Sequence, residues 1–318
     1  MISRRIIRSK VLQILYAFFT SPETSINATE KELFFSLQKT YDLYHYLMAL
    51  VVEIEKFAEE RIDIGKKKLR PTSADLNPNT RFVDNRLIRQ LKSNISLEKH
   101  LQASKLSWAN EGDLVRKLYF LVAEQDFFKA YMEAPESSYA ADRDVVEDIL
   151  KYVILNNEDI EYLLEEQSIY WNDDIDFVVS MVLKTFKKFK EYSDERQALL
   201  PMYKDEEDLQ FAKDLYRRVV LNHKENEALI KQHTTNWDIE RIAFIDNLIL
   251  ELALTEFLNF PSIPTKVTLN EYIELSKYYS TEKSRNFING ILDKALKDLK
   301  KTDKIHKAGR GLIGEEEE

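Results

Sequence analysis

The chain contains no cysteine, and this absence removes several kinds of chemistry at once. Without a thiol there is no disulfide, no thiolate metal site and no cysteine nucleophile. The absence fits a reducing, cytoplasmic setting, where disulfides are rare. The five histidines are scattered, and none forms the i, i+4 pair with a carboxylate ligand that a zinc-binding helix uses. We therefore expect no metal site.

Glycine is almost as scarce. The chain has six glycines, and Gly309, Gly311 and Gly314 lie in the C-terminal tail. Sites that hold phosphates or dinucleotides need clustered glycines, because the backbone N–H groups must come close to the ligand. The scarcity argues against a P-loop enzyme, a Rossmann dehydrogenase and a typical methyltransferase, and we expect no cofactor. Few turns also mean long helices, so the sequence predicts an all-α fold.

No apolar run is long enough to span a membrane, and we expect no membrane partner. Residues 1–20 are basic and then apolar, which superficially resembles a signal peptide. However, Arg8, Lys10 and Gln13 interrupt the apolar run, and no small-residue cleavage site follows it. We expect residues 4–20 to form an amphipathic helix of the mature protein, with the three arginines at positions 4, 5 and 8 largely off its apolar stripe.

The net charge of −9 would by itself argue against a nucleic-acid partner, but the charge is unevenly distributed. The first 22 residues carry four cations and no acid, and residues 294–310 carry seven cations and two acids. Phosphate contacts act within about 8 Å at physiological salt, so a local basic surface on an acidic protein is still a candidate anion site.

Acidic clusters occur at residues 158–166 and 173–176. Paired carboxylates can perform acid–base chemistry, but charged helix faces are far more often solvated surface. No Ser/His/Asp spacing is recognisable. The sequence therefore predicts a protein that is not an enzyme, with no catalytic residues.

Apolar periodicity predicts further helices. Residues 29–62 form one or two helices, in which Tyr41, Tyr44 and Tyr46 lie in or at the edge of the core. A long polar loop follows at residues 65–86, and loops of this length often carry function. Residues 207–232 read as one long helix, and residues 236–292 as three helices.

The last of these three helices begins near residue 281, with Ser280 or Thr281 as its N-cap. Two interpretations of its Asn289-Gly290 pair stay open. Either Gly290 allows another helix to pack closely, with Asn289 bonded locally, or the helix presents a shallow polar surface beside an exposed Phe287. An exposed aromatic ring can stack on an unpaired base, which is worth roughly 1–3 kcal/mol.

Several motifs in this sequence resemble the transcription antitermination factor NusB family, in order and at the family's spacing. The resemblance covers residues 3–20 and about 206–298. It is carried by residues 4–8 (RRIIR), 12–16 (LQILY), 211–215 (FAKDL), 241–246 (RIAFID), 263–277 (IPTKVTLNEYIELSK) and 287–294 (FINGILDK).

The resemblance implies an all-helical bundle of two subdomains that binds boxA-like single-stranded RNA from ribosomal RNA leaders. It further implies a small-subunit ribosomal protein, NusE, as partner, in an antitermination complex on the RNA polymerase elongation complex. By position, the implied RNA-binding residues are Arg4, Arg5, Arg8, Lys283, Arg285, Asn286, Phe287 and Asn289. The implied protein-binding residues are Tyr16 and Asp246.

This chain is about twice as long as a typical family member, so the resemblance implies an insertion of extra helices after the first helix, at about residues 21–205. The expected domains are 1–205 (first helix and inserted region), 206–302 (C-terminal helical core) and 303–318 (flexible charged tail). Two alternatives stay open: a helical protein–protein adaptor, and an RNA-targeting module related to those fused to ribosomal RNA methyltransferases.

Overall fold

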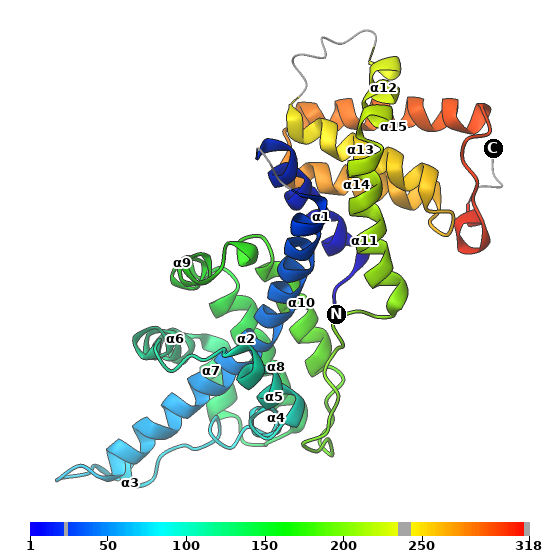
Figure 1. Cartoon of the computed structure of the whole chain (residues 1–318). Coiled ribbons are helices and arrows are strands. Elements are labelled where there is room, and N and C mark those ends of the chain that lie inside the picture. Colours follow the sequence, from blue (N-terminus) through cyan, green and yellow to red (C-terminus); the bar gives the residue numbers. More distant parts are fainter. Residues whose placement is uncertain (22–24, 235–242, 315–318) are drawn as a thin grey trace. The chain divides into compact units, whose positions relative to one another are not determined.

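A computed structural model describes residues 1–21, 25–234 and 243–314, and every regular element within these ranges is a helix (Figure 1). The all-α prediction is confirmed. No helix in these ranges is long and apolar enough to cross a membrane. The predicted helix start at Asn236, the first two residues of the RIAFID motif and the acidic end at 315–318 lie outside the described residues.

The chain forms two compact units. The middle unit contains residues 38–202 and Met1, and the terminal unit contains residues 2–37 and the described residues from Tyr203 onward. The division falls inside the long helix α2 (Ile26–Lys66). The first helix therefore shares a unit with the C-terminal part of the chain.

The terminal unit is built around α13, which is apolar on all sides and almost completely buried. A helix of this kind is stable only when other helices surround it. α13 contacts α1, α11, α12, α14 and α15. The helices of this unit besides the start of α2 are α1 (Arg4–Thr20), α11 (Glu206–Leu221), α12 (His223–His233), α13 (Phe244–Asn259), α14 (Thr265–Tyr279), α15 (Glu282–Lys301) and the 3₁₀ turn η4 (Gly309–Leu312).

The prediction of one helix over residues 207–232 was wrong, because the chain breaks between α11 and α12 at Asn222. Asn222 leaves the helical conformation at φ −100° and ψ 13°. After this turn, His223 Nδ1 lies 2.8 Å from Glu251 Oε2, and Asn226 Nδ2 donates to Thr255 Oγ1 at 2.9 Å. These contacts with α13 favour two shorter helices over a straight one.

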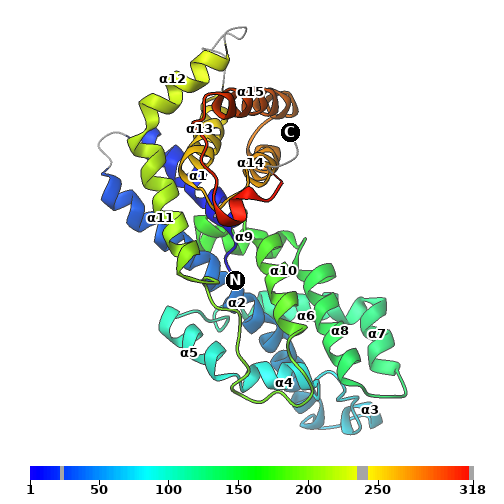
Figure 2. The same ribbon diagram turned by 90° about the vertical axis from the view of Figure 1, so that its right-hand side faces the viewer.

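The segment after α15 returns to the loop between α13 and α14 (Figure 2). The Ala308 backbone N–H donates to the Pro261 carbonyl at 3.0 Å. Gly311 lies so close that a Cβ atom there would be 1.9 Å from the Pro261 oxygen. Only glycine fits this close approach, so Gly311 allows the segment after α15 to pack against the loop between α13 and α14.

The middle unit has its own core around the second part of α2. Tyr44 and Tyr46 are buried and Tyr41 is partly buried, as predicted. The Tyr46 ring stacks on Trp108 at 4.0 Å between centroids, and Trp171 lies 5.7 Å away. The other elements of this unit are α3 (Ser73–Leu76), α4 (Arg86–Lys92), α5 (Ile95–Ser104), α6 (Gly112–Glu124), α7 (Asp126–Glu133), α8 (Tyr139–Ile149), the π-helical turn η1 (Leu150–Ile154), α9 (Glu158–Gln167), the 3₁₀ turn η2 (Ile169–Trp171) and α10 (Ile175–Phe186).

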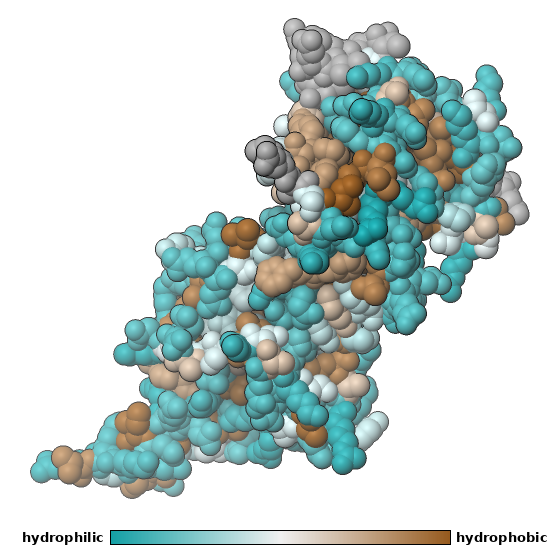
Figure 3. Space-filling view, viewed as in Figure 1, coloured by the Kyte–Doolittle hydropathy of each residue, from teal (hydrophilic) through white to brown (hydrophobic). Residues whose placement is uncertain are grey.

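The predicted loop after residue 65 contains the short helix α3, whose N-cap Thr72 forms a reciprocal capping box with Asp75. The loop presents apolar side chains to solvent, and Figure 3 shows them near α3. Leu69 is fully exposed, and Ile64 and Leu76 are more than half exposed.

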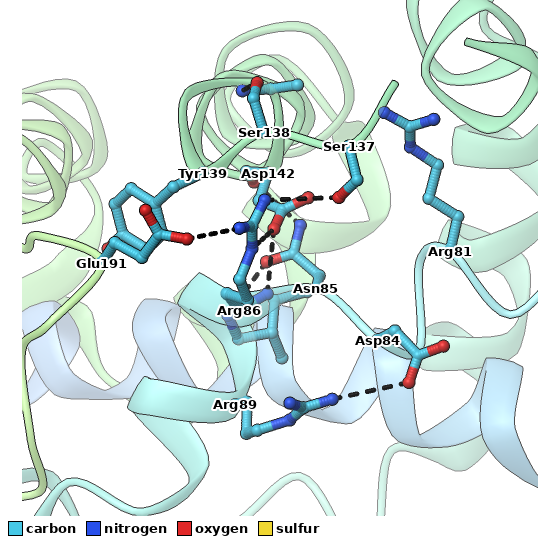
Figure 4. Close-up of polar contacts among 12 residues, drawn as sticks. Arg81, Asp84, Asn85, Arg86, Arg89, Ser137, Ser138, Tyr139, Asp142 and Glu191 are labelled. Carbon is cyan, nitrogen blue, oxygen red and sulfur yellow. Dashed lines mark hydrogen bonds and ion pairs between the residues drawn. The ribbon is translucent and has the colours of Figure 1, made fainter. Parts of the chain in front are cut away.

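A polar cluster in the middle unit is centred on the buried carboxylate of Asp142 in α8, which Figure 4 shows beside Arg86 of α4. Asp142 Oδ2 accepts from Arg86 Nε at 2.7 Å, and its Oδ1 accepts from the Tyr131 hydroxyl at 2.8 Å. Burial, and then the Asp142 carboxylate, raise the pKa of Tyr131, so the phenol stays protonated and donates. Asn85 Nδ2 donates to the Asp142 carbonyl at 2.8 Å.

We expect Asp142→Ala to lower the free energy of unfolding by about 2–4 kcal/mol, because it removes the buried carboxylate that accepts from Arg86 Nε and from the Tyr131 hydroxyl. Urea unfolding followed by circular dichroism measures the change. Lys117→Ala, which removes an exposed ion pair with Asp159, is the control and should cost less than about 1 kcal/mol. Equal small losses in both variants would contradict a structural role for Asp142.

Candidate functional site

Arg8 of α1 does not lie on the surface. Its side chain is 4% exposed and forms a bidentate ion pair with the fully buried Glu256 of α13, at 2.7 Å and 2.8 Å. Glu256 also accepts from Thr268 Oγ1 at 2.8 Å and from the Tyr272 hydroxyl at 3.1 Å, both on α14. Arg8 is buried although it was predicted to lie largely off the apolar stripe, because neighbouring helices cover α1 on more than one side.

The surroundings of this pair hold both charges in place. Burial lowers the pKa of Arg8, but the adjacent Glu256 carboxylate outweighs this and raises the pKa above its ordinary value. The Arg8 guanidinium also lies 5.2 Å from the Phe211 ring of α11 and 5.7 Å from the Tyr272 ring. Four helices of the terminal unit therefore meet at one cation.

The other two arginines of α1 are more accessible. Arg5 is 56% exposed and forms two hydrogen bonds with Glu271 of α14, at 2.7 Å and 3.0 Å. Arg4 is partly exposed, and its Nε lies 2.9 Å from Asp208 Oδ1 of α11. Surface ion pairs of this kind are weak, so a phosphate can compete for Arg5 far more easily than for Arg8.

The candidate residues on α15 follow its cap. Thr281 is the N-cap, as predicted, and accepts from the Ser284 N–H at 3.2 Å. Lys283 and Asn286 are exposed, and Phe287 is partly buried. Residues three and four apart share a helix face, so Lys283 lies beside both Asn286 and Phe287. These three side chains form one group.

Arg285 and Asn289 are also partly buried, and the spacing of four places them together on another part of the helix circumference. Arg285 Nη2 lies 3.6 Å from Glu282 Oε1. The predicted RNA-binding residues of α15 are therefore divided between two adjoining faces.

The surroundings of Gly290 distinguish the two interpretations of the Asn289-Gly290 pair that the sequence left open. Gly290 is exposed, and a Cβ atom at this position would meet nothing within 4 Å. Close helix–helix packing therefore does not explain this glycine. The interpretation of a shallow surface beside Phe287 is the one that agrees with the geometry.

α14 contacts both α1 and α15. Glu271 in the middle of α14 binds Arg5, and the Tyr279 hydroxyl at its end lies 2.6 Å from Ser9 Oγ of α1. α14 also packs along α15. The two sets of candidate RNA-binding residues, far apart in sequence, are thus carried by helices that share one neighbour.

Of the candidate protein-binding residues, Asp246 lies at the start of α13, and Tyr16 of α1 packs against the same end of that helix. Tyr16 is 46% exposed, and its ring lies 5.7 Å from that of Phe244. Phe19 lies 6.4 Å from Phe244 and 4.3 Å from the His223 ring. Asp246 is buried and accepts a hydrogen bond from Ser280, so it joins α13 to the turn before α15.

A second buried carboxylate lies near these aromatic rings. Burial raises the pKa of Glu251 to about 7, and the hydrogen bond with His223 opposes this rise only in part. The His223 ring in turn contacts Phe19. The aromatic group of Tyr16, Phe19 and Phe244 therefore contacts the His223–Glu251 pair through Phe19.

Some functional partners escaped sequence reasoning. Glu256 and Glu251 bind Arg8 and His223, and their signal was two acids inside an otherwise apolar helix, since a buried charge needs a partner. Phe19 and Phe244 extend the group around Tyr16, but no local pattern distinguished them from core residues. Among the described residues, no group of three His, Asp or Glu side chains is arranged to hold a metal ion.

Arg8→Ala should lower the free energy of unfolding by about 3–5 kcal/mol, because it leaves the Glu256 carboxylate buried and unpaired. Arg5→Ala is the matched variant from the same helix and should cost less than about 1 kcal/mol. Urea unfolding of both variants makes the comparison. If Arg8→Ala were as stable as Arg5→Ala, Arg8 would be a surface residue and the structural role would be excluded.

Glu251 should make stability depend on pH. The folded protein holds this proton up to about pH 7, whereas an unfolded chain releases it near pH 4.5, so the contribution to stability is lost as the pH rises through this window. Relative to Glu251→Gln, the unaltered protein should lose on the order of 2–3 kcal/mol between pH 4.5 and pH 8. Parallel curves of unfolding free energy against pH would disprove this assignment.

Comparison with known proteins agrees with the sequence motifs. The NusB family profile matches residues 175–297, a range that includes α10 to α14 and most of α15. The transcription antitermination protein NusB of Salinibacter ruber is 42% identical over 115 residues, which are 36% of this chain and 72% of that protein. The protein of the same name from Chloroherpeton thalassium is 41% identical over 95 residues, which are 30% of this chain and 45% of that protein.

No solved structure matches the chain significantly. The helical architecture around α13, the family profile and the coverage of the Salinibacter protein point the same way: the chain belongs to the NusB family.

Proposed function

We propose that this chain is a transcription antitermination factor that binds boxA-like single-stranded RNA from ribosomal RNA leaders. The observation that carries the proposal is the group of the exposed Lys283 and Asn286 and the partly buried Phe287 beside the open Gly290, inside the segment that matches the family. This group offers a cation for phosphate, an amide for a base edge and a ring for stacking. It contains no arrangement suited to catalysis, so the proposed role is binding.

The arginines of α1 have different parts in this proposal. Arg5, and to a lesser extent Arg4, contact phosphate by exchanging a surface carboxylate for an RNA oxygen, a geometry that suits the guanidinium fork. Arg8 acts indirectly, because its pair with Glu256 fixes the position of α1. Arg285 and Asn289 lie at the edge of the RNA-binding group.

We further propose that NusE binds at Tyr16, with Phe19 and Phe244 completing an exposed aromatic surface. Aromatic residues are enriched at protein interfaces, where they bury a large area. Asp246 helps to position the start of α13, which carries Phe244, through its hydrogen bond with Ser280. In this proposal the RNA and NusE bind together and join the RNA polymerase elongation complex.

The middle unit then corresponds to the inserted region, at about residues 21–205, between the first helix and the core at residues 206–302. The boundaries of the middle unit at residues 38 and 202 support an insertion after the first helix, but residues 21–37 belong to the terminal unit, and the family match begins at residue 175 inside the middle unit. One observation favours a second role for the middle unit, as a protein–protein adaptor. Its exposed Ile64, Leu69 and Leu76 are apolar side chains available to a partner.

The RNA proposal is tested by fluorescence anisotropy with a boxA-like RNA, with and without NusE, over a range of salt. Three phosphate contacts, from Arg4, Arg5 and Lys283, predict a log–log salt slope near −2, at about −0.7 for each contact. Phe287→Ala should weaken binding by roughly 1–3 kcal/mol without unfolding the protein, because a stacked base is lost.

Tyr192→Ala, at a strongly exposed aromatic residue of the middle unit, is the control and should bind as the unaltered protein does. Absence of binding in both conditions would leave the adaptor role as the better account. A large loss of thermal stability in Phe287→Ala would instead make Phe287 a core residue.

A further inference from the structure

One face of α15 stays exposed along the whole length of the helix, well beyond Phe287. The exposed residues on it are separated by three or four positions, the spacing of a single helix face. They are Lys283, Asn286, Gly290, Lys294, Lys297 and Lys301. We name the last three the basic row.

The opposite face of α15 is anchored in the core. Ile288, Ile291, Leu292, Ala295 and Leu299 are buried, so the helix cannot turn over and its exposed face is fixed. At 1.5 Å per residue, the face from Lys283 to Lys301 is about 27 Å long. A stacked single strand with a rise of 3.4 Å per nucleotide covers this distance with about eight nucleotides.

The basic row itself contains no acidic residue. Its nearest acids, Asp293 and Asp298, lie to either side, and Asp298 is 3.6 Å from His233. In the described part of the chain, no ion pair involves Lys294, Lys297 or Lys301, whereas other exposed lysines such as Lys117 have one. Like charges at this spacing destabilise a helix by about 0.2–0.5 kcal/mol for each pair.

The helix dipole explains only one end of this pattern. Cations in the last turn of a helix are favourable, which accounts for Lys301. Lys294 and Lys297 lie further from the C-terminal end, where the effect has faded. An anion bound along the row would offset the repulsion between these lysines.

The kind of anion follows from what the basic row lacks. It exposes no apolar or aromatic side chain, and lysine is depleted in protein–protein interfaces, whose cores are apolar. Several lysines spaced along one helix face can each contact a different phosphate of a polyanion such as RNA. Gly290 leaves the helix backbone open to close approach just where the row joins the Phe287 group.

We propose that the basic row is a phosphate track for the single-stranded RNA that adjoins the boxA-like element. This inference rests on the proposed function and extends it. The Phe287 group holds the element itself, and Lys294, Lys297 and Lys301, which span about 10 Å of the helix, hold the backbone of about three flanking nucleotides. The bound RNA is therefore longer than the element that is read.

The test compares three RNAs by fluorescence anisotropy: the boxA-like core alone, the core with eight unstructured nucleotides on its 5′ side, and the core with eight on its 3′ side. One flanked RNA should bind more tightly than the core. Its salt slope should be steeper by about 2, so its Kd should rise roughly 20-fold more than that of the core between 50 mM and 200 mM salt.

The triple variant Lys294→Gln, Lys297→Gln, Lys301→Gln should abolish the gain from the flank and leave binding of the core unchanged. The control is Lys184→Gln, Lys187→Gln, Lys188→Gln, which removes the same charge from exposed lysines at the end of α10 and should change neither RNA. Circular dichroism of both variants checks that they are folded.

If the core binds but neither flank adds affinity, the phosphate track is excluded and the proposed function stands. The same holds if the triple variant binds the flanked RNA as tightly as the unaltered protein does. If the core itself does not bind, the proposed function fails and the track fails with it.

Discussion

The buried ion pair between Arg8 and Glu256 is the interaction on which the terminal unit depends. Removing two charges from water is costly, and only complete hydrogen bonding offsets the cost. Here Thr268 and Tyr272 supply further bonds to the carboxylate, and the Phe211 ring covers the guanidinium. Because such a pair tolerates little displacement, it sets the position of α1 against three other helices.

Both candidate surfaces follow from that position. Once Arg8 is directed inward, Arg5 lies near the rim, within reach of Glu271 and solvent. Two turns after Arg8, Tyr16 meets Phe244 at the start of α13. α13 contributes two buried carboxylates. Glu256 contacts α1 and α14, and Glu251 contacts α12. The stability of the fold and the placement of its binding groups therefore depend on the same helix.

Local features of the fold were accessible from the sequence. Apolar spacing predicted α1, and a threonine cap predicted the start of α15. The features that sequence reasoning missed depend on contacts between residues far apart in the chain. The charge of Arg8 suggested solvent, since its partner lies 248 positions away along the chain. The break at Asn222 depends on contacts of His223 and Asn226 with α13, and Gly290 had two meanings until its surroundings were known. The assignment of roles to Lys283 or Tyr16 came from resemblance, because exposure alone does not name a ligand.

The central claim is that RNA binds the terminal unit on α15 and the first turn of α1. Photo-crosslinking of a boxA-like RNA that carries 4-thiouridine, followed by mass spectrometry of the cross-linked peptides, tests it most directly. The account predicts cross-links in residues 282–301, foremost at Phe287, and near Arg5. Cross-links confined to residues 38–202 would contradict it, because the RNA would then be bound by the middle unit alone.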